Sequence, residues 1–195
     1  MKLVYALAAV LMCATTTAVH ATASVGQPAP DFTVNDTSGK PHALSAYKGK
    51  YVVLEWTNAE CPFVQKHYDS GNMQSLQKTW GGKGVVWLAI NSTNAGHSEY
   101  TKADEMASRW KKYGASPHAI LMDTDGKAGR QFQARTTPHM YIVNPQGVLI
   151  YAGGIDDKRS ANPADVKTAK NHVAAALNEA LAGKPVTVAT SSPYG

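Results

Sequence analysis

The chain has 195 residues, two cysteines and a formal net charge of +5 at pH 7. The charge is modest and the lysines are scattered, with no basic run that interleaves with aromatics, so the composition argues against nucleic-acid binding. A chain of this length can bury a full hydrophobic core as one domain without disulfide crosslinks.

Residues 1–23 have the pattern of a secretory signal peptide. A short apolar run, Leu3–Met12, leads to small residues at Ala21–Ala23, which predict cleavage after them. Because the run is too short to cross a bilayer, we expect a periplasmic or secreted protein without stable membrane insertion. Cleavage would remove Cys13, although Cys13 would be the lipidated residue in the alternative case of a lipoprotein.

After the signal peptide, the first half of the chain alternates predicted strands and helices. Asp31–Val34 is a candidate strand, and a turn separates it from a short ordered segment at Ala43–Tyr47. The apolar run Tyr51–Trp56 predicts a buried strand. Apolar residues then recur with helical spacing over Pro62–Trp80, which predicts one helix with a bend at Gly71.

The alternation continues in the second half. Val85–Ile90 is almost wholly apolar, which predicts a central strand covered on both faces. Ser98–Tyr113 is a predicted helix with a serine N-cap. The short strand Ile120–Met122 precedes a helical turn that extends to about Gln133.

The last elements are a hairpin and a helix. Met140–Val143 and Val148–Tyr151 flank the turn Asn144–Gly147, which is a strong hairpin signal. Ala164–Ala182 is the final predicted helix, and the polar, proline-containing segment 184–195 is expected to be a loosely held, flexible tail.

Cys61 is the only cysteine after the signal peptide and the best candidate for a chemical role. It lies between the predicted strand Tyr51–Trp56 and the helix that begins at Pro62. At that position the amide groups and the positive end of the helix dipole favour a nucleophilic thiolate. A lone cysteine is also often a small buried hydrophobic residue, so a structural role stays open.

Three features together resemble the thioredoxin superfamily: Cys61 between strand and helix, Thr137-Pro138 before a strand, and the turn Asn144–Gly147. Over about residues 25–182 the chain resembles its redoxin branch, the alkyl hydroperoxide reductase and thiol-specific antioxidant (AhpC/TSA) proteins and their exported relatives. The resemblance implies an α/β fold with a mixed central sheet flanked by helices and an N-terminal extension. It also implies that Pro138 is a cis proline facing Cys61 and that the backbone of Thr137 pairs with a thiol partner.

The sequence also departs from the family pattern. Val64 replaces the second thiol of the Cys-x-x-Cys motif, so the internal disulfide of a thioredoxin cannot form. Peroxiredoxins carry a threonine three residues before the reactive cysteine, whereas here Asn58 holds that position and Thr57 lies one residue earlier. Thr57 or Asn58 could still donate a hydrogen bond to a thiolate or a peroxide, although both are expected to be solvated loop residues.

Other residues near the cysteine or the Thr-Pro pair are candidates for the site. Arg135 precedes the pair, and the resemblance implies that its guanidinium stabilises the thiolate and the charge that develops in peroxide cleavage. Pro62 belongs with Thr137 and Pro138 to the expected partner-binding surface. Glu60 is expected to face solvent, and His67 is expected to be a partly exposed helix residue rather than a base for the thiol.

Metal binding is an alternative from a different class. Sco-type copper chaperones share the thioredoxin-like fold, and Cys61-Pro62 retains the first thiol and the proline of their motif while Gln65 replaces the second thiol. Cys61 with His139 and Met140 would form an incomplete site for a soft ion. A redoxin-fold module that binds a partner without turnover is a third alternative.

The sequence therefore predicts an exported thiol oxidoreductase, with a domain at 24–183, that uses Cys61 alone and needs neither metal nor cofactor. The thiolate would attack a peroxide, giving a sulfenic acid, or a protein disulfide, giving a mixed disulfide. A small thiol or a thioredoxin-like reductant would then restore it. Relatives of this subfamily continue past a Pro-aromatic-Gly segment like Pro193–Gly195 into a second cysteine, which a longer C-terminus could supply.

Overall fold

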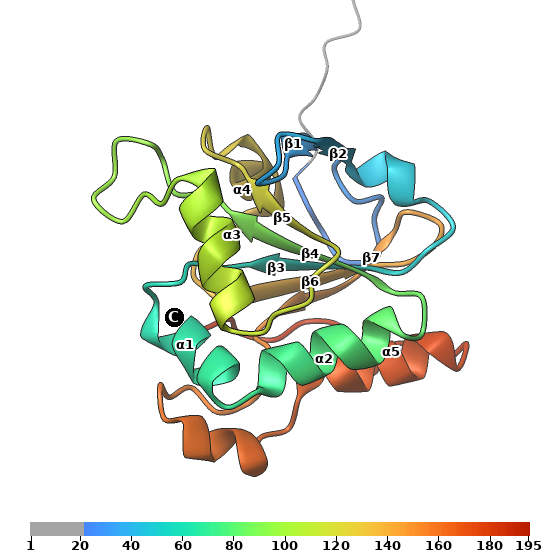
Figure 1. Cartoon of the computed structure of the whole chain (residues 1–195). Coiled ribbons are helices and arrows are strands. Elements are labelled where there is room, and N and C mark those ends of the chain that lie inside the picture. Colours follow the sequence, from blue (N-terminus) through green and yellow to red (C-terminus); the bar gives the residue numbers. More distant parts are fainter. Residues whose placement is uncertain (1–21) are drawn as a thin grey trace, which may run out of the picture.

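A five-stranded mixed sheet forms the centre of the computed structural model, which describes residues 22–195 (Figure 1). The strands, in the spatial order β5-β4-β3-β6-β7, are β3 (Val52–Trp56), β4 (Val86–Asn91), β5 (Ala119–Met122), β6 (His139–Val143) and β7 (Leu149–Gly153). β3, β4 and β5 run parallel, whereas β6 is antiparallel to both β3 and β7. The predicted signal peptide lies outside the described residues except for its last two positions.

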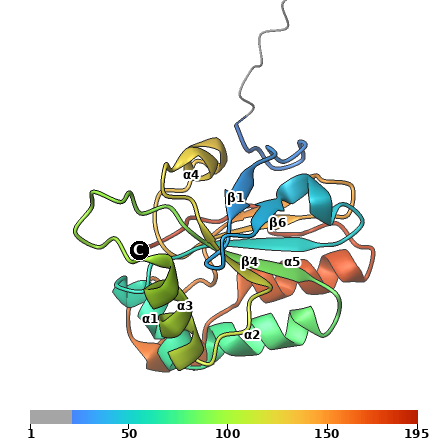
Figure 2. The same ribbon diagram turned by 45° about the horizontal axis from the view of Figure 1, so that its top comes forward.

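Four helices cover one face of this sheet: α1 (Pro62–Asp69), α2 (Asn72–Gly81), α3 (Ala103–Lys112) and α5 (His172–Leu181). Side chains alternate between the two faces of a strand, so Val53, Trp87 and Ile142 point toward these helices and are fully buried there. Figure 2 shows α2 and α5 on this side of the sheet. The arrangement confirms the predicted mixed sheet flanked by helices.

The other face carries the N-terminal extension and one short helix. Strands β1 (Thr33–Asn35) and β2 (Pro41–Ala43) pair antiparallel and lead into the 3-10 turn η1 (Leu44–Tyr47). Helix α4 (Lys127–Phe132) lies on the same side, above the sheet in Figure 2. Leu54 of β3 is buried in the second core that these elements form with the sheet. Among residues 22–195 no helix combines the length and apolar character needed to cross a bilayer.

The antiparallel pairing of β3 with β6 brings two distant segments together. Trp56, at the end of β3, stands opposite His139, at the start of β6. The loop that follows β3 therefore lies at the same edge of the sheet as the loop that precedes β6. This register places Cys61 next to Thr137.

Two predicted helices differ from the observed structure: one is divided into two helices, and the other begins later than predicted. The segment 62–80 is two helices, because Gly71 adopts a left-handed backbone with a φ of 74° that an α-helix cannot contain. The helix predicted from Ser98 begins only at Ala103, after the N-cap Lys102. Asp104 and Glu105 lie in the first turn of the observed helix, where their charges complement the helix dipole; in a helix capped at Ser98 they would lie beyond the first turn.

The final predicted helix is also interrupted. Residues 164–182 contain the end of a 3-10 turn, η2 (Pro163–Lys167), and then helix α5. The side chain of Asn171 accepts a hydrogen bond of 2.8 Å from the backbone nitrogen of Ala174 and so caps a new helix start. The apolar residues keep a helical spacing on both sides of this break, so the sequence pattern does not reveal it.

The C-terminal segment 184–195 packs against the domain, in contrast to the expected loose tail. Ser191 donates a backbone hydrogen bond of 3.2 Å to the carbonyl oxygen of Ala152 in β7, and Ala152 donates one of 3.1 Å to Ala189. Tyr194 is only 5% exposed. Figures 1 and 2 both show the C-terminal end beside α1. Backbone pairing and one buried aromatic ring hold a segment whose composition is otherwise that of a tail.

Candidate functional site

Cys61 lies on the turn between β3 and α1, as predicted. It is the N-cap residue of α1, with φ −73° and ψ 121°, and Pro62 fills the first helical turn at an exposed position. The carbonyl oxygen of Cys61 accepts hydrogen bonds from the nitrogens of Val64 at 3.0 Å and Gln65 at 2.9 Å. Because the side chain makes no capping hydrogen bond, the half-buried thiol is available for other contacts.

Asn58 shapes the loop that carries the thiol. Its carbonyl oxygen accepts a hydrogen bond of 3.1 Å from the Cys61 nitrogen, and its Oδ1 accepts one of 3.0 Å from the Glu60 nitrogen. The Nδ2 of Asn58 donates to Glu99 at 2.7 Å. Glu60 is exposed, as expected, and forms an ion pair with Arg109. The loop geometry therefore directs the Glu60 carboxylate to a surface cation.

The thiol faces the backbone of Thr137. The Sγ of Cys61 donates a hydrogen bond of 3.0 Å to the carbonyl oxygen of Thr137. The Thr137-Pro138 peptide bond is cis, which confirms what the family resemblance implies. Pro138 is buried and Thr137 is half-buried, so the backbone of Thr137 is the part of this pair that meets the thiol.

Thr57 is not the solvated loop residue that the sequence predicts. It is 1% exposed, and its backbone extends the β3–β4 pairing through a hydrogen bond of 2.9 Å from its nitrogen to the Ile90 carbonyl. Within the described part of the chain its Oγ1 has no hydrogen-bond partner. The residue is buried because its backbone stays paired with β4 one position past Trp56, the last residue of β3.

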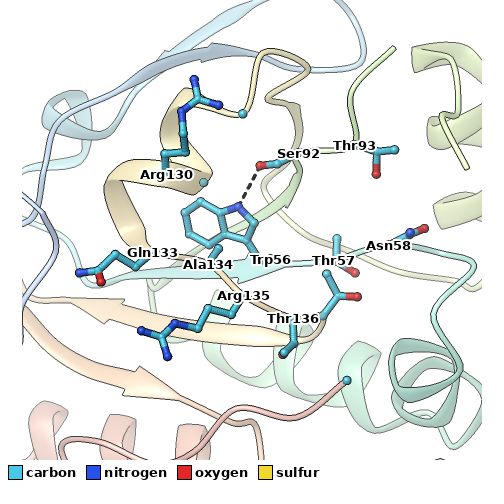
Figure 3. Close-up of a pocket in the computed structure, with 14 residues that line it drawn as sticks. Trp56, Thr57, Asn58, Ser92, Thr93, Arg130, Gln133, Ala134, Arg135 and Thr136 are labelled. Atoms are coloured by element: carbon cyan, nitrogen blue, oxygen red, sulfur yellow. Dashed lines mark hydrogen bonds between the residues drawn. The ribbon is translucent and has the colours of Figure 1, made fainter. Parts of the chain in front are cut away.

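Arg135 lines a pocket that Thr137 also lines. The pocket has a volume of about 720 Å³. Figure 3 shows Arg130, Gln133 and Arg135 on one side of it, with the guanidinium of Arg135 directed away from Thr57. In this conformation Arg135 is therefore part of the pocket wall and does not point toward the loop that carries Cys61.

A buried carboxylate behind the loop escaped the sequence analysis. Glu55, in β3, is fully buried and accepts hydrogen bonds from Trp87 Nε1 at 2.7 Å and Tyr68 Oη at 2.9 Å. Gln77 Nε2 donates a longer one of 3.4 Å. Burial raises the pKa of Glu55 to about 7, against the opposing effect of the bonds from Trp87 and Tyr68. The available signal was an acidic residue inside the apolar run Tyr51–Trp56.

His67 is fully buried, which corrects the expectation of a partly exposed helix residue. Its Nδ1 accepts a hydrogen bond of 2.9 Å from Asn72, which leaves the ring proton on Nε2, 3.2 Å from the hydroxyl of Tyr194. Burial lowers the pKa of His67 to about 4, although the Asp156 carboxylate partly opposes this shift. The ring is therefore neutral and holds the C-terminal segment instead of serving the thiol.

Lys66 and Asp156 complete a buried polar cluster around that tyrosine. The Nζ of Lys66 lies 3.6 Å from Asp156 Oδ2 and donates hydrogen bonds to the Lys158 carbonyl at 2.7 Å and the Tyr194 hydroxyl at 3.4 Å. The Tyr194 hydroxyl donates to Asp156 Oδ1. We call Lys66, His67, Asp156, Lys158 and Tyr194 the Tyr194 cluster. No spacing in the sequence links its members, because they come from α1, a loop and the C-terminal segment.

The residues of the copper-binding alternative are engaged elsewhere. The Nδ1 of His139 lies 3.0 Å from the Tyr141 hydroxyl, and Met140 is fully buried in β6. Burial, and to a lesser extent the charge of Arg135, lowers the pKa of His139 to about 4. Across residues 22–195 no group of three or more His, Cys, Asp or Glu side chains could hold a metal ion. The geometry of the described chain therefore gives that alternative no support.

Comparison with known proteins places this geometry in a family context. The AhpC/TSA family model matches residues 25–152. The thiol-disulfide oxidoreductase ResA of Bacillus subtilis is 29% identical over 127 residues, which cover 65% of this chain and 65% of ResA, just under two thirds of its length. The thioredoxin-like protein YneN of the same organism is 29% identical over 143 residues, covering 72% of this chain and 79% of YneN.

A solved structure shows the same architecture over most of the chain. An uncharacterised conserved protein of Geobacillus kaustophilus superimposes with a TM-score of 0.72 at 25% identity and covers 87% of each chain. Together with the family match, this similarity shows that the mixed sheet and its helices form a thioredoxin-like redoxin fold.

Proposed function

Because this chain belongs to the AhpC/TSA family, we propose that it is a thiol-disulfide oxidoreductase with Cys61 as its nucleophile. The observation that carries the proposal is the position of the Cys61 sulfur, at the N-terminus of α1 and 3.0 Å from the carbonyl oxygen of Thr137. A cysteine at the start of a helix is well placed to act as a nucleophile, and the neighbouring backbone offers a docking edge for a partner once Gly195 moves away from it. ResA, which is 29% identical over 127 residues, is named for the same activity.

The reaction needs one sulfur of this chain. The Cys61 thiolate attacks one sulfur of a substrate disulfide, the S–S bond breaks, and the departing thiolate takes up a proton. A mixed disulfide between Cys61 and the substrate remains. An external thiol, either small or on a thioredoxin-like protein, then attacks this bond and regenerates Cys61. Val64 stands where a second thiol of the motif would resolve the intermediate, so we propose that the resolving thiol comes from outside the Cys-x-x-Cys position.

The surroundings of Cys61 have defined tasks in this proposal. The Thr137 backbone contacts the partner on one side of the sulfur once Gly195 moves away from it, the exposed Pro62 contacts it on the other, and the buried Pro138 holds the Thr137 backbone in place. Arg135 supplies positive charge to anionic groups in the pocket next to Thr137.

Peroxide reduction is a second candidate, and it is favoured by Thr57. Its buried hydroxyl lies near the Glu55 carboxylate without a hydrogen bond of good geometry, and it would donate to a peroxide oxygen after the side chain turns toward Cys61. The Cys61 thiolate would attack one oxygen and become a sulfenic acid, while the O–O bond breaks and the second oxygen leaves as water or an alcohol after protonation. The same external thiols would reduce the sulfenic acid to the thiol and water.

We further propose that the protein works outside the cytoplasm, because residues 1–23 have the charge, apolar run and cleavage pattern of an export signal. Its partners are a disulfide or peroxide substrate and a thiol reductant. In an oxidising compartment such a thiol needs a dedicated source of electrons.

The test is exchange of the purified protein with hydroxyethyl disulfide, a small neutral disulfide, followed by mass spectrometry of the adduct at Cys61. Cys61→Ser and Cys61→Ala should abolish adduct formation while the circular dichroism spectrum stays that of the parent. A parallel pulse of stoichiometric hydrogen peroxide tests the second candidate by the gain of one oxygen atom on Cys61. A parent protein that forms neither adduct would contradict both functions and favour a non-catalytic binding module.

A further inference from the structure

The pocket beside Thr137 carries two arginines. Its fourteen lining residues include Arg130 and Arg135 and no acidic side chain, and the one negative charge among them is the terminal carboxylate of Gly195, which lies at the Thr137 end. Neither arginine forms a salt bridge within residues 22–195, and Arg130 donates only to the backbone carbonyl of Asp125, at 3.0 Å. Glu99 is held at the rim by Asn58 but does not line the pocket. We call this cavity the arginine pocket.

The arginine pocket also carries hydrogen-bonding groups that the protein leaves unused. Thr57 and Thr136 both line it, and the Oγ1 atoms of both are buried without a hydrogen-bond partner in the described chain. Figure 3 shows Thr57, Asn58 and Thr93 on the side opposite Arg130 and Arg135. Because these two hydroxyls are buried, a ligand that spans the pocket meets Asn58 and Thr93 at one end and the arginines at the other, and it meets the hydroxyls only if the two threonine side chains turn.

The thiol lies next to the Thr137 end of the pocket without lining it. Cys61 contacts the carbonyl oxygen of Thr137, which lines the pocket, and its nitrogen is bound to the carbonyl of Asn58, which also lines it. A disulfide sulfur placed at Thr137 would thus leave the rest of its molecule directed toward Arg130 and Arg135. Guanidinium groups bind carboxylates with paired, charge-assisted hydrogen bonds.

Size and access favour a small ligand over a protein chain. The volume of about 720 Å³ is within the range of pockets that enclose small molecules. Gly195 occupies the backbone edge of Thr137, since a Cβ on this glycine would overlap the Thr137 carbonyl oxygen and lie 3.1 Å from its nitrogen. An extended protein substrate could pair with that edge only after the C-terminal segment moves, whereas the arginine pocket is open in the present conformation.

We propose that the arginine pocket binds low-molecular-weight disulfides that carry carboxylates, and that it places one of their sulfurs at Cys61. This inference rests on the proposed thiol-disulfide function and names its substrate class. The Cys61 thiolate attacks the bound disulfide, forms a mixed disulfide and releases one carboxylate-bearing thiol, which takes up a proton. A second molecule of such a thiol attacks the mixed disulfide, forms a new small disulfide with the bound half and restores the Cys61 thiolate, so the cycle exchanges thiols between small disulfides.

The experiment compares three small disulfides of different charge on the purified protein. Oxidised glutathione is anionic, hydroxyethyl disulfide is neutral and cystamine is cationic, and the rate of adduct formation at Cys61 is measured for each. After correction for their intrinsic reactivity toward a free thiol, we expect glutathione to react about tenfold faster than hydroxyethyl disulfide, and cystamine to react slowest. Added salt should reduce this preference because it screens the exposed guanidinium groups.

Charge variants localise the effect. Arg130→Gln and Arg135→Gln should each lower the ratio of the glutathione rate to the hydroxyethyl disulfide rate by about threefold to tenfold. Lys78→Gln, which removes one exposed positive charge on α2 away from the pocket, should leave the ratio at its parental value.

Two results separate failure of this inference from failure of the proposed function. Equal corrected rates for all three disulfides, or a ratio that the arginine variants do not change, would overturn the ligand class while leaving the exchange activity intact. No adduct with any disulfide would overturn the proposed function itself. Arginine-dependent exchange with a disulfide inside an acidic peptide, but not with oxidised glutathione, would overturn the assignment to a small molecule.

Discussion

The hydroxyl of Tyr194 donates a hydrogen bond to the Asp156 carboxylate beneath α1, and this bond anchors the C-terminal segment next to the Cys61 thiol. His67 and Lys66 contact the same hydroxyl, and the Tyr194 ring packs edge to face on Phe63. Through this anchor Gly195 lies against Thr137, whose carbonyl oxygen binds the Cys61 sulfur. Access to the thiol is therefore coupled to the packing of one aromatic residue.

Replacing the anchor should expose the thiol. Tyr194→Ala removes the ring and leaves Asp156 and Lys66 without one partner, so we expect the segment from Ser191 onward to detach and Cys61 to react with iodoacetamide several times faster. Tyr194→Phe keeps the ring and loses only the hydroxyl, so its free energy of unfolding should fall by about 1–3 kcal/mol with a smaller gain in alkylation rate. An alkylation rate in Tyr194→Ala equal to that of the parent would show that the segment does not restrict the thiol.

The buried His67 should make the protein sensitive to acid. Its pKa is lowered to about 4 in the folded state, from 6.5 in a solvated histidine, so the unfolded chain takes up a proton first. The stability that the neutral ring contributes is fully present above pH 6.5 and is lost as the pH falls toward 4. Between these two pH values the free energy of unfolding of His67→Gln should therefore fall by about 3 kcal/mol less than that of the parent. Urea unfolding at pH 7 and pH 4 measures this, and parallel losses in the two proteins would contradict it.

Glu55 should have the opposite pH dependence. Its pKa is raised from 4.5 to about 7 by burial, so the unfolded chain loses its proton before the folded one does. The stability of the folded state relative to a variant that cannot ionise is greatest below pH 4.5 and declines as the pH rises through 7. Relative to that of the parent, the free energy of unfolding of Glu55→Gln should therefore rise by about 3 kcal/mol between pH 4.5 and pH 8.

The measurement for Glu55 is again the free energy of unfolding across that pH range. The Gln variant conserves the size of the side chain and an acceptor for Trp87, so the comparison isolates the charge. A difference between the two proteins that is constant with pH would mean that the carboxyl group titrates as it does in the unfolded chain.

Close packing between β7 and the C-terminal segment gives a steric prediction. A Cβ at Gly153 would lie 2.5 Å from the carbonyl oxygen of Ser191 and 2.7 Å from its nitrogen. Because these are backbone atoms, Gly153→Ala should displace the segment and destabilise the protein by about 1–3 kcal/mol. Gly81→Ala is the matched control, since a Cβ there meets nothing within 4 Å and the residue belongs to α2. Thermal unfolding of both variants measures the effect. A Gly153→Ala protein as stable as Gly81→Ala would contradict the prediction.

Much of the fold could be predicted because local signals and the final structure agree. The apolar runs Tyr51–Trp56 and Val85–Ile90 became neighbouring parallel strands, and the turn at Asn144–Gly147 joins the predicted hairpin. The helix ends were less accurate, because the break at Gly71 and the late start at Ala103 depend on capping that apolar periodicity does not record.

By itself the sequence determined the strand-helix order and the place of Cys61 before α1, since each depends on residues close together in the chain, and it determined the family from the order of several such local features. Only the tertiary structure decided the surroundings of the thiol. The antiparallel register of β3 and β6 sets Cys61 against Thr137, and Tyr194 meets Asp156 across 38 residues. Such contacts join segments whose separation in sequence carries no periodic signal, because they arise from the packing of whole elements and not from local backbone preference.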